Sequence, residues 1–261
     1  MVKSKKINAQ ICLEMVCYFL FSGTVIWFLA SGKYLSYITP KMMPYLIFSV
    51  VVMGFWIALS FWRLMRPQYK VRAMHCLVIL IPTLLMISLP QTTVDGGNLS
   101  GDFATANTMG GVSRPLDSGT LGISPSERAE IDEMPGLDKE NKTITVSDKD
   151  FSMWMTEIYN RMDEFKGYTV TMTGYVFTDS ELLEDNEFVP ARLMMSCCIA
   201  DLVPTGMRAT YEKAAALEEG SWVTVEAILD IKEGEGYREP KLLVNKVTPT
   251  EPVEGYIYPS Y

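Results

Sequence analysis

Two adjacent cysteines, Cys197 and Cys198, stand out as residues with reactive side chains. They lie in the segment MMSCCIAD, three residues before Asp201. Thiolate sulfur binds soft and borderline metals, and a carboxylate can complete such a ligand set. The sequence therefore makes Cys197, Cys198 and Asp201 the candidate ligands of a metal or metalloid ion.

Two other roles remain open for the paired thiols, namely a redox pair and inert burial in a core. Neighbouring side chains in a strand point to opposite faces, so only a turn would bring both sulfurs onto one ion. Exposed thiols also tend to oxidise outside the cytoplasm. Met194, Met195 and Met207 would add thioether ligands, although methionine in a small core usually serves packing. We rank metal contact first, burial second and redox chemistry third.

Signals for enzymatic chemistry are missing from the sequence. His75 is its one histidine, which excludes a His-rich metal site within this chain and argues against a Ser-His-Asp triad. No phosphate-binding loop is present, and the neighbouring acids Glu184 and Asp185 fall in a turn that we expect to be solvated. We therefore expect a protein that is not an enzyme, with no catalytic residues.

The cysteines follow one of several strand-like segments in the C-terminal part of the chain. Alternating apolar residues predict strands at 168–177, 188–197, 206–211, 221–231 and 241–247. Five strands joined by turn-rich segments predict a small OB-like β-barrel. Gly174 interrupts the alternation of the first strand, as the glycine of a β-bulge would.

A helix is predicted ahead of these strands. A short strand at 143–146 precedes Ser147, a candidate N-cap residue. The apolar residues Phe151, Met155, Ile158, Met162 and Phe165 then recur at helical spacing, and Gly167 would end the helix. Residues 143–261 thus form an α+β domain with a small barrel.

The N-terminal part of the chain is strongly apolar. Its apolar runs at about 11–30, 42–62 and 73–89, the first broken only by Glu14, each approach the roughly 20 residues that cross a bilayer. We therefore predict a membrane anchor of three transmembrane helices over residues 1–90, in contact with the lipid bilayer. The first run is longer than a signal-peptide core, which favours an uncleaved anchor. Glu14 and His75 are its candidate functional polar side chains, although an interfacial position explains each more simply.

Charge separates the two halves of the 261-residue chain. Residues 1–90 carry nine Lys or Arg against one acid, whereas residues 91–261 carry fourteen against thirty. An acidic surface repels phosphate backbones, which excludes nucleic acid as a partner. The basic flanks of the apolar runs predict a cytoplasmic N-terminus and an extracellular C-terminal domain of a multi-pass protein in the bacterial cell membrane. A flexible polar linker at 91–142 is expected between them.

The segment ARLMMSCCIADLVPTG, behind apolar spans and a polar linker, resembles the YcgQ-like family of bacterial permease subunits. The resemblance covers the whole chain and is most specific over residues 143–258. The positions that carry it are Gly174, Arg192, Cys197, Cys198, Asp201, Trp222 and Val223. It implies an accessory role beside a larger permease related to the arsenical permeases, and it carries over no catalytic residue.

Two functions follow as expectations. In the first, the chain is a non-enzymatic accessory subunit of a polytopic membrane permease, and its outer domain contacts a metal or metalloid through Cys197, Cys198 and Asp201. In the second, it is an envelope thiol-redox or metal-sensing protein that acts without a permease. Three short spans are too few for an ordinary transport path, which favours the first.

Overall fold

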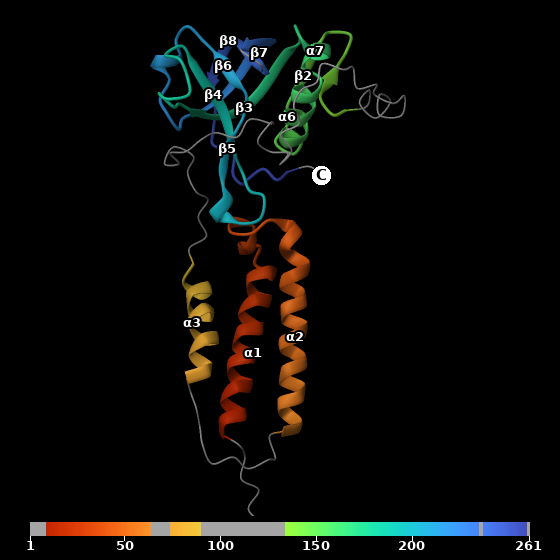
Figure 1. The fold of residues 1–261 in the computed structure, drawn as a ribbon, viewed down its shortest axis with the longest axis vertical. Coiled ribbons are helices and arrows are strands. Elements are labelled where there is room, and N and C mark those ends of the chain that lie inside the picture. The colour runs from red at the N-terminus through yellow and green to blue at the C-terminus, as the bar shows by residue number, and fades with distance from the viewer. Residues whose placement is uncertain (1–8, 64–73, 90–133, 235–236, 260–261) are drawn as a thin grey trace, which may run out of the picture. The chain divides into compact units, whose positions relative to one another are not determined.

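A computed structural model describes residues 9–63, 74–89, 134–234 and 237–259 of the chain (Figure 1). The chain divides into two compact units. One comprises Met1–Thr92 together with Cys197–Ile199, and the other comprises Thr93–Ser196 and Ala200–Tyr261. The three residues 197–199 therefore belong to the first unit, although the chain on either side of them belongs to the second.

The first unit is built from three apolar helices. These are α1 (Ala9–Ala30), α2 (Met43–Arg63) and α3 (Met74–Ser88), and α1 packs against both others (Figure 1). Cys17, Val25 and Phe28 are the buried apolar side chains along α1 after its first turn. None of the 21 residues of α2 is buried, and many of its large apolar side chains are exposed within the described chain.

Two of these helices are long and apolar enough to cross a membrane. They are Gln10–Ala30, with a mean hydropathy of 1.8, and Pro40–Arg63, with 2.1. Signal sequences and core helices also meet this criterion. The 15 residues of α3 rise by roughly 22 Å, short of the roughly 30 Å of hydrocarbon. The structure therefore confirms an apolar helical N-terminal part with two helices of spanning length, and it does not confirm three transmembrane helices.

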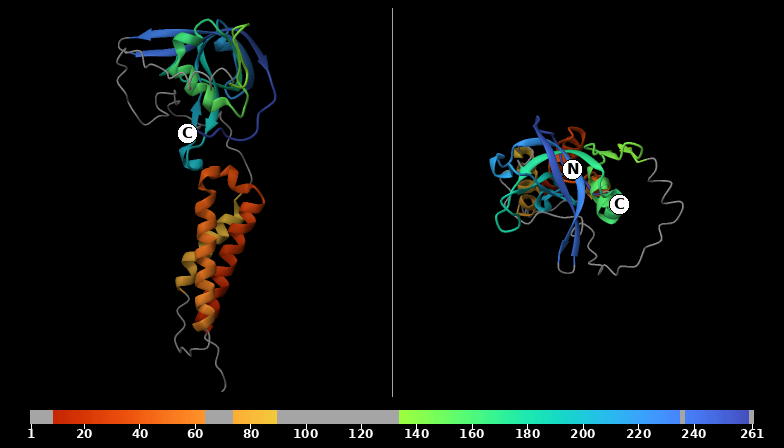
Figure 2. Two further views of the ribbon diagram at one scale, coloured as in Figure 1. Left: turned by 90° about the vertical axis from the view of Figure 1, so that its right-hand side faces the viewer. Right: turned by 90° about the horizontal axis from the view of Figure 1, so that it is seen from above.

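The second unit contains a closed β-barrel. Its five strands are β3 (Thr169–Phe177), β4 (Glu187–Met194), β6 (Arg208–Thr210), β7 (Trp222–Gly234) and β8 (Tyr237–Pro249). They pair in the order β3-β7-β8-β6-β4, and β4 pairs back to β3 to close the ring. Only β6 and β8 are parallel within it. Figure 2 shows β7 and β8 as a long hairpin on the barrel. The predicted barrel is confirmed, with the strand number of an OB fold.

Further strands and a helix extend this barrel. β1 (Leu137–Asp138) pairs with β2 (Thr143–Thr145), and β2 lies parallel to β3. β5 (Val203–Thr205) pairs with β4. The barrel domain thus begins before Thr143, earlier than predicted, because Met134 is buried in its core and β1 joins its sheet. Residues 91–133 of the predicted linker lie outside the described chain.

The predicted amphipathic helix forms in two parts. α6 (Phe151–Asn160) and α7 (Met162–Phe165) are separated at Arg161, which has a non-helical backbone. Asp150 occupies the N-cap position in place of Ser147, whose hydroxyl bonds the Asp150 carboxylate at 2.6 Å. Gly167, with φ 83°, follows the second helix. The buried face of this segment packs on the barrel strands as the spacing predicts.

Candidate functional site

The adjacent cysteines lie just beyond the end of β4. The strand stops at Met194, the chain bends at Ser196 and Cys197, and the short 3-10 turn Ile199–Asp201 leads into β5. Because the chain has left the extended conformation, the two side chains no longer point apart. The two sulfur atoms lie 3.6 Å from each other. Cys197 is exposed and Cys198 is half-buried, so the sulfur pair is open to solvent.

Asp201 is hydrogen-bonded within the segment that carries the cysteines. Its Oδ1 accepts a hydrogen bond from the backbone N–H of Ser196 at 3.0 Å. This bond closes the turn that carries both cysteines. Among the described residues, no group of three or more His, Cys, Asp or Glu side chains is placed to hold a metal ion. The structure thus brings two of the three predicted ligands together.

The three neighbouring methionines are core residues. Met194, Met195 and Met207 are 3%, 0% and 5% exposed. Their side chains fill the interior of the barrel domain, which accounts for them without a metal. These methionines therefore serve packing, and the candidate site consists of the two thiols.

Backbone pairing fixes the thiol segment on both sides of Cys198. Within the first unit, Cys198 pairs with Ile38 in an antiparallel bridge. The N–H of Thr39 donates to the carbonyl of Cys197 at 3.1 Å, and the N–H of Ile199 donates to the carbonyl of Tyr37 at 2.9 Å. These two bonds constrain the backbone conformation in which the sulfurs converge.

The remaining predicted polar residues lie in α1, in α3 and in the turn before β4. Glu14 is half-buried in α1 and accepts a hydrogen bond from Gln10 Nε2 at 2.8 Å. His75 lies in the first turn of α3, and its side chain is outside the described part of the structure. Glu184 and Asp185 are exposed, as expected for a solvated turn.

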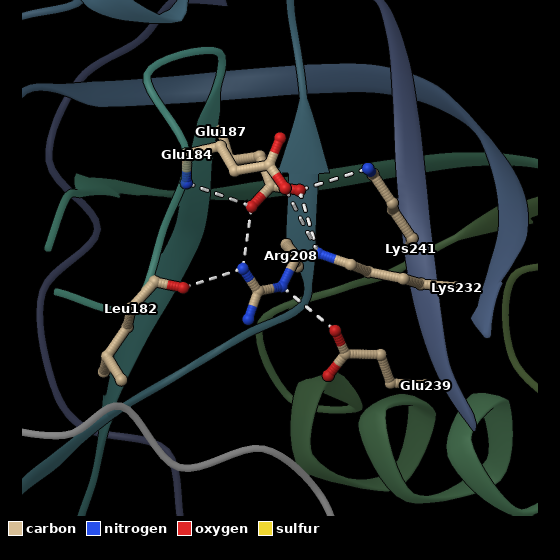
Figure 3. Close-up of polar contacts among 7 residues, drawn as sticks. All are labelled: Leu182, Glu184, Glu187, Arg208, Lys232, Glu239 and Lys241. Atoms are coloured by element: carbon tan, nitrogen blue, oxygen red, sulfur yellow. Dashed lines mark hydrogen bonds and ion pairs between the residues drawn. The ribbon is translucent and has the colours of Figure 1, made fainter. Parts of the chain in front are cut away.

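A buried ionic cluster, missed by the sequence analysis, lies at the opposite end of β4 (Figure 3). The side chain of Glu187 is fully buried and meets three cations. Its carboxylate lies 2.7 Å from Arg208, 3.1 Å from Lys241 and 3.5 Å from Lys232. Arg208 also lies 3.0 Å from Glu239. The cluster thereby links strands β4, β6, β7 and β8 across the barrel wall.

The charge of Glu187 is stabilised by these partners. Loss of hydration would by itself raise the pKa of Glu187. Hydrogen bonds from Arg208 and Lys241 outweigh that effect and lower the pKa from 4.5 to about 2. The acidic residue at the start of β4, a mostly apolar strand, was the one sequence signal of this site. Its partners lie 21 or more residues away, so no local pattern reveals them.

Two positions that carry the family resemblance, Gly174 in β3 and Arg192 in β4, lie on neighbouring strands. Arg192 is a buried side chain of β4, lies over the ring of Trp222 at 5.3 Å and pairs with Asp148.

Gly174 lies in continuous register with Val223 and is therefore not a β-bulge. A Cβ atom there would lie 2.6 Å from the carbonyl carbon of Pro190. The glycine is required by the close approach of two strands.

Comparison with known proteins places both parts of the chain in one family. The DUF1980 N-terminal domain matches residues 13–102, and the DUF1980 C-terminal domain matches residues 124–259. The UPF0703 protein YcgQ of Bacillus subtilis (strain 168) is 28% identical over 121 residues, which are 45% of this chain and 42% of that protein. The chain is thus matched to less than half the length of this curated relative. With both domains present in order, the chain belongs to the DUF1980, or YcgQ-like, family.

Proposed function

We propose that this protein is a membrane-anchored accessory subunit of a permease, and that its thiol pair takes up a soft metal or metalloid ion outside the cytoplasm. The observation that carries the proposal is the 3.6 Å separation of the Cys197 and Cys198 sulfurs. Two sulfurs that bind one tetrahedral ion at about 2.3 Å lie roughly 3.8 Å apart. The thiols therefore need little rearrangement to share an ion.

The small number of ligands favours capture and transfer over permanent storage. Structural zinc sites are closed by four protein ligands, whereas this pair supplies two. Open coordination positions remain for water, for a small solute or for side chains of a partner. Such a site releases its ion more readily than a closed one, as a subunit that passes ions to a permease requires.

The helices favour a membrane partner. α1 and α2 have the length and hydropathy of membrane spans, and α2 carries no buried residue. Lipid or the helices of a polytopic permease would cover this apolar surface. We assign the protein a multi-pass position in the bacterial cell membrane, with its N-terminus inside and its barrel domain outside. The charge distribution of the flanking loops supports this orientation.

Metal titration of the full-length protein in detergent tests the thiol site. Cd²⁺ is the probe, because thiolate-to-metal charge transfer gives an ultraviolet absorption band that reports bound sulfur. The wild type should bind one ion with this band. C197S and C198S should each weaken binding by about tenfold or more, which is at least about 1.4 kcal/mol. The matched control is C12S, which changes an exposed cysteine of α1.

Two results would contradict the proposal. If C197S and C198S retain wild-type Cd²⁺ affinity, the sulfur pair is not the site. The freshly isolated protein could instead carry a disulfide between the two cysteines that reforms after reduction and prevents Cd²⁺ binding. In that case the thiol-redox function replaces the proposed metal uptake. Mass spectrometry of alkylated protein distinguishes free, metal-protected and linked thiols.

The permease partner needs its own test. Cross-linking in native membranes at natural expression, followed by purification of this protein, should recover a polytopic membrane protein. Recovery should persist in C197S, because helix contacts and not the thiols hold the complex. Isolation of this protein alone after efficient cross-linking would reject the accessory-subunit role. The metal site would then still be tested independently by the Cd²⁺ titration.

A further inference from the structure

A second candidate site lies in the barrel unit and involves neither cysteine. It is a cavity of about 400 Å³ whose polar walls are formed by Asp148, Lys149, Arg192, Glu254, Tyr256 and Tyr258. This volume lies within the range of roughly 300–1,000 Å³ found for small-molecule sites. The cavity is bounded by the segment before α6, by β4 and by the C-terminal segment.

Backbone hydrogen bonds shape the cavity. Ile257 pairs with Met194 in a parallel bridge beside β4. Its N–H donates to the carbonyl of Leu193 at 2.9 Å, and its carbonyl accepts from the N–H of Met195 at 3.0 Å. The C-terminal segment is thus attached to the strand that carries Arg192. Two tyrosines flank Ile257, and both line the cavity.

Arg192 provides a fixed positive charge in this cavity. Its side chain is 3% exposed and lies over Trp222, so the guanidinium has little freedom to move. Its ion-pair partner Asp148 is 53% exposed and belongs to the segment ahead of α6. The exposed aspartate is therefore the partner that can move aside when another carboxylate enters, whereas the arginine is held in place. Another carboxylate that enters the cavity can take the place of Asp148 without leaving a buried charge unpaired.

The signs of the surrounding charges define the ligand further. Two cationic and two anionic side chains line the cavity, so its charges balance. A simple anion bound to Arg192 would share the cavity with Glu254 and the displaced Asp148, both negative, and with Lys149 as the one other lining cation. A ligand that also carries an ammonium group would turn these two repulsions into attractions.

We infer that this cavity binds a small zwitterion of the α-amino-acid type, whose carboxylate pairs with Arg192 and whose ammonium group faces Glu254 and the displaced Asp148. The tyrosines form the walls beside the ligand. This inference is independent of the thiol pair.

Ligand binding to full-length protein in detergent tests the inference, with L-alanine as the probe and calorimetry as the measurement. Propionate and ethylamine each retain one half of the zwitterion. L-alanine should bind saturably, and each half-molecule about tenfold more weakly, or about 1.4 kcal/mol. R192Q should abolish binding of L-alanine and propionate alike.

Two exposed positions keep the test decisive if R192Q does not fold. E254Q should weaken the binding of L-alanine without weakening that of propionate, because only the ammonium group loses a partner. D148N should raise the affinity for propionate, because it removes the carboxylate that competes for Arg192. D230N, which alters an exposed aspartate 3.1 Å from Lys166, is the matched control and should change neither affinity.

Three outcomes would overturn the inference. Absence of saturable L-alanine binding by the wild type rejects the site. Equal affinities for L-alanine and propionate reject a zwitterionic ligand. Unchanged affinities in both E254Q and D148N place the binding elsewhere on the protein. None of these outcomes bears on Cd²⁺ binding by the thiol pair.

Discussion

The carboxylate of Glu187 and the guanidinium of Arg208 form a buried ion pair with 2.7 Å between Oε2 and Nη1. Glu187 opens β4 and Arg208 opens β6, and these strands pair antiparallel. The side chain of Glu187 is fully buried and that of Arg208 is 15% exposed, so water cannot replace either partner. The pair holds one end of the strand whose other end leads to the two cysteines.

Replacement of Glu187 should destabilise the barrel strongly. E187Q leaves Arg208 and Lys241 without their shared carboxylate, and loss of one partner from a buried pair costs about 3–5 kcal/mol. Hydrogen exchange of the full-length protein should show faster opening of β4 and β6. The matched control is E226Q, which breaks the exposed ion pair between Glu226 and Lys246, whose atoms are 2.9 Å apart. It should lower the free energy of unfolding by less than about 1 kcal/mol. Equal effects of the two variants would contradict a structural role for the cluster.

Acid should weaken the domain through the same residue. The folded pKa of about 2 lies below the ordinary 4.5, so the unfolded chain binds the proton more readily. The stabilisation is therefore complete above pH 4.5 and is lost as the pH falls toward 2. Its size is on the order of 3 kcal/mol. Denaturant unfolding between pH 7 and pH 2 should show a weaker pH dependence for E187Q than for the wild type. Parallel pH profiles would refute this assignment.

Gly174 should not tolerate a side chain. The Cβ of G174A would lie within 2.8 Å of three backbone atoms of Pro190 and Ala191, which cannot rotate away. Overpacking of this kind costs about 1–3 kcal/mol, and more where backbone must shift. The unfolding midpoint should fall accordingly. G54A has no atom within 4 Å of the new Cβ and should leave the midpoint of this domain unchanged.

Thiol labelling of intact cells tests the proposed orientation. A membrane-impermeant maleimide should modify Cys197, the exposed member of the pair, before the cells are lysed. The C197S variant should lose most of this label, and Cys17 should remain unmodified because its side chain is buried in the first unit. Labelling of Cys197 that requires lysis would place the barrel domain on the cytoplasmic side.

Local patterns in the sequence are sufficient to predict most elements of this fold. The helical spacing of Phe151, Met155 and Ile158 gives α6, and alternation along 168–177 and 221–231 gives β3 and β7. Such patterns are visible because each strand or helix buries one face, and the period is set by backbone geometry. β1 and β5 escape prediction: they have two and three residues, and the apolar alternation does not continue into their flanking residues as it does around the equally short β2 and β6.

The adjacent thiols are determined by the sequence alone, but their convergence depends on the tertiary structure. Had β4 continued through Cys198, the two sulfurs would point to opposite faces. The bend after Met195, the bond from Ser196 to Asp201 and the pairing of Cys198 with Ile38 decide otherwise. The ionic cluster of Glu187 likewise joins side chains from four strands. Contacts between residues distant in sequence leave no periodic signal, so only the folded chain reveals them.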